Sequence, residues 1–219
     1  LREQDALMAE RAAIEDLRPQ LQGVEHEFVV VSPAEISGER IVWVKEETPQ
    51  GSVAAGNRAF AAARGDVVLM GVDDVRFAKG AVAEALSVFA DPGRPVPLAL
   101  TFAHRLRALD CVSVVFGRLF PTIFAFGRAD AEKTGGFLDP GYRTGCADPD
   151  LGLRIWAAGG QVRRARANVR FLADRKGHGE GPQKTNAVIE KDVARFAGLW
   201  RPRFDPIWGE SDGDYILLI

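Results

Sequence analysis

The chain has few of the residues on which disulfide frameworks and metal clusters depend. It holds two cysteines, Cys111 and Cys146, and three histidines among 219 residues. The two cysteines lie far apart and lack the spacing of a metal site, so we interpret both as reduced thiols. Reduced thiols are typical of cytosolic proteins, and we therefore expect a cytoplasmic location.

Long apolar runs and basic blocks are also missing. No apolar run reaches the roughly 20 residues of a membrane-spanning helix, and the chain opens on Leu1 without a signal-peptide pattern. The formal net charge is −2, from 28 Lys and Arg against 30 Asp and Glu. Without a basic block, nucleic acid is not the expected partner. We find no internal repeat, no low-complexity segment and no clear domain boundary.

What remains is the pattern of an α/β domain. Hydrophobic residues make up 47% and charged residues 26%, as in soluble globular proteins. Short β-branched runs alternate with stretches of helical period, which predicts a mainly parallel sheet covered by helices on both faces. We predict strands at 28–31, 41–44, 67–72, 96–102, 122–127 and 162–171. We predict helices at 1–21, 53–64, 77–89, 128–134, 149–158 and 183–199. Residues 104–119 and the last twenty residues have no clear pattern.

The first candidate site is the pair Asp73 and Asp74, directly after the apolar run 67–72. In an open α/β sheet, ligands bind at the carboxyl ends of the strands. Carboxylates at this edge can hold Mg²⁺ or Mn²⁺, which takes further ligands from waters and substrate phosphates. The alternative is a solvated turn, because Asp is a common turn former.

A second candidate site follows the glycine-rich turn 135–136. Asp148 and Asp150 stand at the start of the helix predicted at 149–158. Asp148 is either the cap of that helix or a general base toward a hydroxyl nucleophile. A third motif, 51–58, contains Ser52 as a candidate helix cap. The backbone amides of that helix start are suited to a phosphate-bearing ligand.

These three motifs, in this order and spacing, resemble the family 2 glycosyltransferases, which have a nucleotide-sugar-binding α/β fold called GT-A. The resemblance covers roughly residues 28–162. The matching motifs are Asn57, Ala-Arg-Gly-Asp at 63–66, Val-Asp-Asp at 72–74, Gly-Gly-Phe-Leu-Asp at 135–139, and Ala-Asp-Pro-Asp-Leu at 147–151 with Arg154 and Gly159.

The resemblance implies transfer of a sugar, with inversion, from a nucleotide diphosphate donor to a hydroxyl acceptor. It implies that Asp74 binds Mn²⁺ or Mg²⁺ on the donor diphosphate, with Asp73 facing the donor sugar or ribose. Asp148 corresponds to the acid that deprotonates the acceptor hydroxyl. His178 matches a further metal ligand of some members, and Asp174 competes for that role. The other implied residues are Asn57, Gly135 and Gly136 for donor binding and Asp150 and Arg154 for acceptor support.

The resemblance also sets the expected organisation and partners. We expect a GT-A domain at 1–182, with a C-terminal helix and tail at 183–219 packing on it. The family's first strand has no counterpart in the chain shown, so it is either missing or supplied from elsewhere. The implied acceptors are glycan, lipid-linked or protein intermediates of bacterial polysaccharide biosynthesis. Peripheral association with a membrane or with other glycan-assembly proteins is implied as well.

Three departures from the family pattern keep other functions open. Ser32-Pro33, Val72 and Ala147 stand where the family commonly has acidic residues. A degenerate, non-catalytic nucleotide- or carbohydrate-binding domain is therefore an alternative. Nucleotidyltransferases form a third class, because they also use strand-end acids and Mg²⁺.

Overall fold

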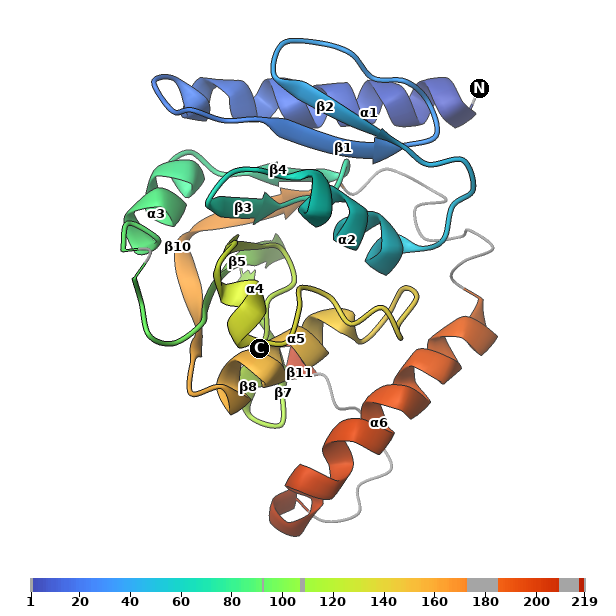
Figure 1. Cartoon of the computed structure of the whole chain (residues 1–219), viewed down its shortest axis with the longest axis vertical. Helices are drawn as coiled ribbons and strands as arrows, with labels where there is room; N and C mark the ends of the chain where they lie inside the picture. Colours follow the sequence, from blue (N-terminus) through green and yellow to red (C-terminus); the bar gives the residue numbers. More distant parts are fainter. Residues whose placement is uncertain (1, 92, 107–108, 173–184, 209–216, 219) are drawn as a thin grey trace.

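Strands and helices alternate along the chain, as the sequence predicts (Figure 1). The computed structural model describes residues 2–91, 93–106, 109–172, 185–208 and 217–218. The helices are α1 (Arg2–Leu17), η1 (a 3-10 helix, Arg18–Leu21), α2 (Ser52–Ala62), α3 (Ala81–Val88), α4 (Asp130–Lys133), α5 (Ala147–Ala157) and α6 (Asn186–Trp208). The strands are β1 (Phe28–Ser32), β2 (Ile41–Lys45), β3 (Val67–Met70), β4 (Val75–Phe77), β5 (Leu98–Leu106), β6 (Leu109–Cys111), β7 (Ser113–Val115), β8 (Arg118–Leu119), β9 (Phe124–Gly127), β10 (Gln161–Phe171) and β11 (Leu217–Leu218).

The central layer is a six-stranded mixed sheet. Its order is β3-β9-β5-β10-β4, and β6 pairs with β5. Within it β5 and β10 are parallel, whereas the other pairs are antiparallel. The predicted α/β class is confirmed, but the expectation of mainly parallel strands is wrong for this sheet. The chain leaves β5, turns back through short strands and inserts β9 antiparallel between β3 and β5, and such short connections favour antiparallel pairing.

Helices cover both faces of this sheet, so its central strands are buried on both sides. α3 contacts β3 and β10 on one face, and α5 contacts β5 and β10 on the other. Along β5, Leu100 faces the α3 side and Ala99 faces the α5 side. Phe124 and Phe126 of β9 point to the α5 side and are almost fully buried. This alternation follows from the two-residue period of a strand.

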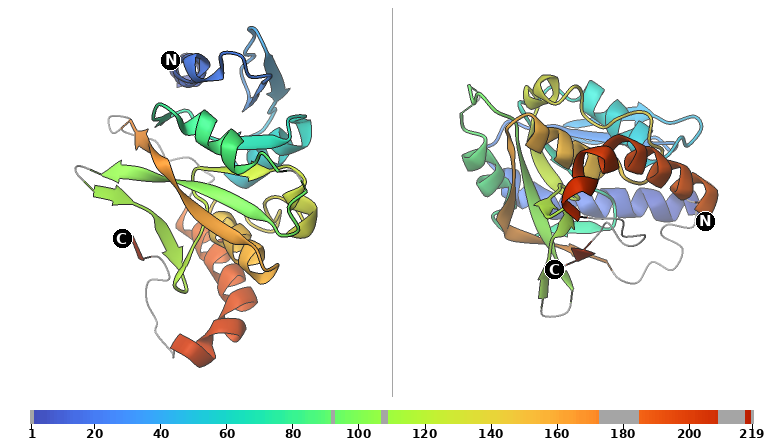
Figure 2. Two further views of the ribbon diagram at one scale, coloured as in Figure 1. Left: turned by 90° about the vertical axis from the view of Figure 1, so that its left-hand side faces the viewer. Right: turned by 90° about the horizontal axis from the view of Figure 1, so that it is seen from below.

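A second, smaller sheet lies above the first (Figures 1 and 2). It consists of the parallel pair β1 and β2, with α1 contacting β4 and α2 contacting both strands of the pair. In the described part of the chain, no strand pairing joins this pair to β3. The strand predicted at 67–72 ends earlier, at Met70, and β3 is half-buried because it is an edge strand with one neighbour.

Some predicted boundaries are wrong. We predicted a helix that begins at Phe77. In the structure Phe77 is the last residue of strand β4, and helix α3 begins at Ala81. Ser52 is the first residue of α2 and makes no capping bond, since the cap position is Gly51 with φ of 105°. The unassigned stretch 104–119 contains the end of β5 and the strands β6 to β8.

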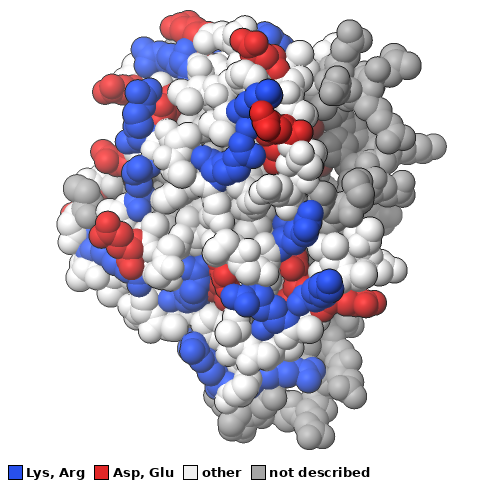
Figure 3. Space-filling view, turned by 45° about the vertical axis from the view of Figure 1, so that its right-hand side comes forward, with Lys and Arg blue, Asp and Glu red and all other residues white. Residues whose placement is uncertain are grey.

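The surface carries charges of both signs. On the face shown in Figure 3, Lys and Arg side chains are interspersed with Asp and Glu side chains. Ion pairs such as Arg195 with Asp139 and Arg64 with Glu27 balance charge locally. Among the helices that the structure describes, none combines the length and the apolar character needed to cross a bilayer.

Candidate active site

Three strands of the central sheet point to the same edge. Met70, the last residue of β3, pairs with Phe124 of β9, and Phe124 pairs with Thr101 of β5. Since β9 is antiparallel to both, β3 and β5 run in one direction, and β10 runs parallel to β5. The turn 71–74, which follows β3, therefore lies at the end of the sheet where the carboxyl ends of β3, β5 and β10 are found.

Asp73 and Asp74 form the turn between β3 and β4, where the sequence predicts them. Both side chains are half-buried. The main chain of the turn is held from two sides: Arg76 Nη1 donates to the Asp73 carbonyl and the Leu172 amide donates to the Asp74 carbonyl, each at 2.8 Å. These bonds attach the turn to β4 and to the end of β10, while the carboxylates supply hard oxygen atoms at the sheet edge.

A third carboxylate near this turn has no signal in the sequence. Burial raises the pKa of Glu10 on α1, a hydrogen bond with Ser32 opposes this, and the Asp73 carboxylate raises it further. Glu10 Oε2 is buried and has no hydrogen-bond partner among the residues that the structure describes. Glu10 comes from a helix more than sixty residues away in the chain, so only the tertiary structure brings it to Asp73.

Asp148 lies in the first turn of α5, which begins two residues earlier than predicted. The cap position is Cys146, which has φ of 60° and makes no side-chain capping bond. The hypothesis that Asp148 caps this helix is therefore wrong. Within the described residues its carboxylate makes no hydrogen bond or ion pair, and burial raises its pKa to about 7. A carboxylate with this pKa can take up a proton near neutral pH.

Asp150, two residues further along α5, has the opposite environment. It is 2% exposed and accepts hydrogen bonds from Arg154 Nε at 2.7 Å, Trp200 Nε1 at 2.8 Å and the Tyr142 hydroxyl at 3.4 Å. Burial and the Asp150 carboxylate raise the pKa of Tyr142. Asp150 is thus fully engaged inside the protein, and its observed contacts are structural.

Arg154 connects this carboxylate to the glycine turn. Its guanidinium donates to the carbonyls of Thr134, Gly136 and Phe137 at 2.7, 2.9 and 2.6 Å. Gly135 and Gly136 have φ of 72° and 121°, a conformation that L side chains rarely adopt. The two glycines thus shape the turn, and Arg154 holds it.

Asn57 of α2 binds the other side of the same turn. Its Nδ2 donates to the Leu138 carbonyl at 3.0 Å, and its Oδ1 accepts from the Leu138 amide at 3.1 Å. The observed role of Asn57 is therefore to dock α2 on the turn, and a contact with the donor stays a prediction.

The start of α2 is not an open phosphate cradle. The Val53 amide donates to the Arg143 carbonyl at 3.3 Å, and Ser52 Oγ donates to the Thr144 carbonyl at 3.4 Å. A Cβ at Gly51 would lie 2.3 Å from that Arg143 oxygen. The loop before α5 therefore occupies this helix start, contrary to the expectation for motif 51–58.

The first turn of α5 lies toward the same sheet edge as the turn 71–74. α5 contacts β5 and β10 and returns into β10 through the turn 158–160, so the helix runs opposite to β10. A Cβ at Gly152 would lie 2.5 Å from Phe120 Cβ, which places the helix against the segment leading into β9. The start of β9 pairs with the end of β3. Both acidic motifs therefore lie toward the same end of the sheet, the one that holds the carboxyl ends of β3, β5 and β10.

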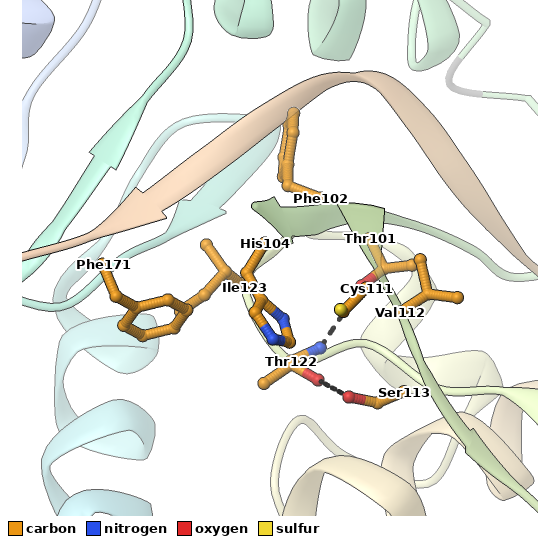
Figure 4. Close-up of a pocket in the computed structure, with 9 residues that line it drawn as sticks. All are labelled: Thr101, Phe102, His104, Cys111, Val112, Ser113, Thr122, Ile123 and Phe171. Atoms are coloured by element: carbon orange, nitrogen blue, oxygen red, sulfur yellow. Dashed lines mark hydrogen bonds between the residues drawn. The ribbon is translucent and has the colours of Figure 1, made fainter. Parts of the chain in front are cut away.

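A small pocket lies at this edge (Figure 4). Its volume is about 10 Å³, the space of one water molecule. His104 packs edge-on against Phe171, with ring centroids 5.7 Å apart, and Thr122 Oγ1 donates to Ser113 Oγ at 3.0 Å. The pocket is too small for a sugar, and its contacts assign His104 to packing. The predicted ligands His178 and Asp174 lie outside the described residues.

Comparison with solved structures identifies the architecture. The chain superposes on "GalNAc-T7 with UDP, GalNAc and Mn2+" with a TM-score of 0.67 and 12% identity, over 90% of this chain and 46% of that one. It superposes on the mannosyltransferase PcManGT from Pyrobaculum calidifontis, in complex with GDP-Man and Mn²⁺, with a TM-score of 0.60 and 19% identity, over 86% and 60%. For S. aureus TarS 1-349 the TM-score is 0.51 at 14% identity, over 92% and 73%.

The chain has the GT-A fold. The predicted fold class is thereby confirmed. The chain spans about half of the first of these proteins and 60% of the second. The sequence matches no protein-family model and no curated protein, so the likeness to GT-A proteins is one of fold. In this fold, the Asp73–Asp74 turn and the first turn of α5 become the two candidate halves of an active site.

Proposed function

We propose that this chain transfers a sugar from a nucleotide diphosphate donor to a hydroxyl acceptor, as a member of the family 2 glycosyltransferases. The observation that carries the proposal is Asp148. It is a desolvated carboxylate without a partner in the described residues, with a pKa of about 7, two residues from a fully paired one. A structural acid acquires partners as Asp150 does, whereas a general base needs a free oxygen and a pKa near the working pH.

The chemistry assigned to Asp148 is removal of one proton. Its carboxylate takes the proton of the acceptor hydroxyl as that oxygen forms a bond to the anomeric carbon. The bond from this carbon to the diphosphate oxygen breaks, and its electron pair leaves with the nucleoside diphosphate. With the base on the face opposite the leaving group, the product has inverted configuration.

The Asp73–Asp74 turn fits a hard divalent cation. Two adjacent half-buried carboxylates supply oxygen ligands of the kind that Mg²⁺ and Mn²⁺ take, and the remaining positions suit diphosphate and water. The described residues contain no group of three or more His, Cys, Asp or Glu side chains that could hold a metal ion, so the proposal requires that substrate oxygens and water complete the coordination. When bound, it supplies charge neutralisation for the leaving diphosphate. Asp74 is its first proposed ligand, and His178 a further one.

The comparisons support the donor class. The solved structures hold UDP with Mn²⁺, GDP-Man with Mn²⁺, or UDP-GlcNAc. We propose a sugar nucleotide for this chain on that ground. A glycan, lipid-linked or protein acceptor, a cytoplasmic location and a role in bacterial polysaccharide assembly complete the proposal.

The second candidate is a donor-binding domain without transferase activity. Among the described residues, β1 and β2 form a separate sheet that makes no strand pairing with β3. This observation favours the second candidate, because the strands next to the site are then not part of one continuous sheet. Val72 is 43% exposed and adds no carboxylate to the turn.

The two candidates separate in one experiment. The chain is incubated with UDP- and GDP-linked sugars, Mn²⁺ and hydroxyl acceptors, and released nucleoside diphosphate and glycosylated product are quantified. A parallel thermal-shift series with nucleoside diphosphates, with and without Mn²⁺, reports binding through the stabilisation that a ligand gives the folded state. Product formation supports transfer, and an Mn²⁺-dependent shift without product supports the binding domain. Neither signal, with any donor, overturns both.

A further inference from the structure

Helix α6 contacts the loop that leads into α5. Its residues reach several points of the segment 137–150, and the helix lies beside α5 and that loop (Figures 1 and 2). Arg195 pairs with Asp139 at 2.7 Å and lies over the Tyr142 ring. Trp200 donates to Asp150. No candidate site residue in the sequence comes from α6, so these contacts suggest a function for the helix that local motifs do not reveal.

The central contact is made by Asp192. The residue is 4% exposed, and its carboxylate accepts hydrogen bonds from three successive amides: Arg143 at 3.1 and 3.2 Å, Thr144 at 2.9 Å and Gly145 at 2.8 Å. A carboxylate that accepts from several backbone amides is bound strongly, because charged hydrogen bonds are about twice as strong as neutral ones.

The opposite side of the same segment is held by α2. The carbonyls of Arg143 and Thr144 accept from Val53 and Ser52. The amides of residues 143–145 thus point to α6 and two of their carbonyls point to α2. Cys146 follows with φ of 60°, and a non-glycine residue keeps such a conformation only where its surroundings enforce it.

Asp148 comes three residues after the last of these amides. Burial, followed by the charges of Asp192, Asp148 and Asp150, raises the pKa of the Cys146 thiol to about 11. The Asp192 and Asp148 carboxylates therefore each lie close enough to Cys146 to act on its thiol. A displacement of the segment 143–145 would move the first turn of α5 and the carboxylate on it.

We infer that Asp192 is a positioning residue, which fixes the loop 143–146 and thereby the place of Asp148 in the active site. The inference rests on the proposed function, since it assigns Asp148 as the base. Because Asp192 is buried and its carboxylate is engaged by the loop amides, we assign it no contact with donor or acceptor. Its effect is geometric, and a misplacement of about 1 Å can cost roughly 100-fold in rate.

The test compares Asp192→Asn with the matched control Asp130→Asn. Asp130 is the first residue of α4 and, like Asp192, is buried. It pairs with Arg94 and Lys133 and makes no contact with the loop 143–146 among the described residues. Hydrogen exchange of the peptide 143–148, the transfer rate at saturating acceptor, and the donor dissociation constant are measured for both variants and the parent.

We expect Asp192→Asn to accelerate exchange in the peptide 143–148 and to lower the transfer rate about 10- to 100-fold. The donor dissociation constant should stay at the parent value. Asp130→Asn should lower the thermal midpoint while leaving loop exchange and transfer rate unchanged. A purely structural role of Asp192 would make the two variants alike, and parent-like transfer and exchange in Asp192→Asn overturn the inference.

Exchange in the parent covers the case in which Asp192→Asn does not fold. In the parent, the contact with Asp192 should protect the amides of Arg143, Thr144 and Gly145 from exchange. Exchange of these amides at the rate of an open loop would contradict that contact. An inactive parent overturns the proposed function, whereas an active parent with an unchanged Asp192→Asn variant overturns only the inference on Asp192.

Discussion

The two acidic motifs, the turn after β3 and the first turn of α5, are built differently. Asp73 and Asp74 sit half-buried in a turn whose described bonds attach its main chain to Arg76 and Leu172. Asp148 and Asp150 sit on a helix whose approach loop is held by side chains of other helices. Asp148 is half-buried, as Asp73 and Asp74 are, and of these four acids only Asp150 is enclosed by the protein.

The second motif contains a sharper contrast within two residues. Asp150 is neutralised by Arg154, with further donors from Trp200 and Tyr142, whereas burial alone raises the pKa of Asp148 to about 7. Residue type and helix position are nearly the same, so the partners decide what each acid does.

The largest expected effect belongs to Asp148→Asn. If Asp148 is the base, the amide cannot take the proton, and turnover should fall by about 10² to 10⁴-fold. The donor dissociation constant should be unchanged, because the donor side lies at Asp74. Transfer kinetics and donor titration of variant and parent measure both quantities. Near-parent turnover in the variant would remove Asp148 from the mechanism.

The same residue predicts a pH dependence. The base works when deprotonated, so parent turnover should rise with pH through about 7. The folded pKa exceeds the ordinary value of about 4. Its contribution to the free energy of unfolding is therefore fully present below pH 4 and is lost as pH rises through 7. The thermal midpoint of Asp148→Asn minus that of the parent should accordingly increase as the pH rises from 4 to 8.

The next effect concerns stability. Arg154→Ala leaves Asp150 as an uncompensated buried charge and frees three carbonyls of the glycine turn. Breaking such a pair costs about 3–5 kcal/mol in the free energy of unfolding. Urea unfolding measures it, with Arg163→Ala as control, because Arg163 is exposed on β10 and binds only Gln161 among the described residues. Equal losses in the two variants would contradict the structural role of Asp150 and Arg154.

A smaller effect is expected at the donor side. Asp74→Asn should abolish the gain in nucleoside diphosphate affinity that Mn²⁺ provides, a coupling of about 5- to 150-fold between two ligands. Titrations with and without Mn²⁺ measure this gain, and Asp66→Asn, on the exposed turn before β3, serves as control. If the gain persists in Asp74→Asn, the cation is held elsewhere.

The smallest effect is expected for Asn57→Ala. It removes the two hydrogen bonds to the Leu138 main chain and should lower the free energy of unfolding by about 1–2 kcal/mol. If donor affinity stays at the parent value while stability falls, Asn57 serves the turn alone. A selective loss of donor affinity at parent stability would assign it to the donor after all.

Local pattern was sufficient for most elements. The β-branched runs at 28–31 and 41–44 and the periodic stretches near α1, α2 and α5 lie within a few residues of the observed elements. Strand β4 was not predicted, because three residues after an acidic turn show no period of their own. The direction of β9 was also beyond local pattern, since pairing with β3 and β5 depends on residues far apart in the chain.

By itself, the sequence determined that the chain is an α/β domain and where its acids stand relative to strand and helix ends, because composition and periodicity are local properties. Only the tertiary structure decided which acid has partners. Asp150 meets Trp200, the loop before Asp148 meets Asp192, and Glu10 comes to Asp73. Hydrogen bonding and desolvation depend on what surrounds a side chain, and in these three cases the surroundings come from residues 50, 47 and 63 positions away along the chain.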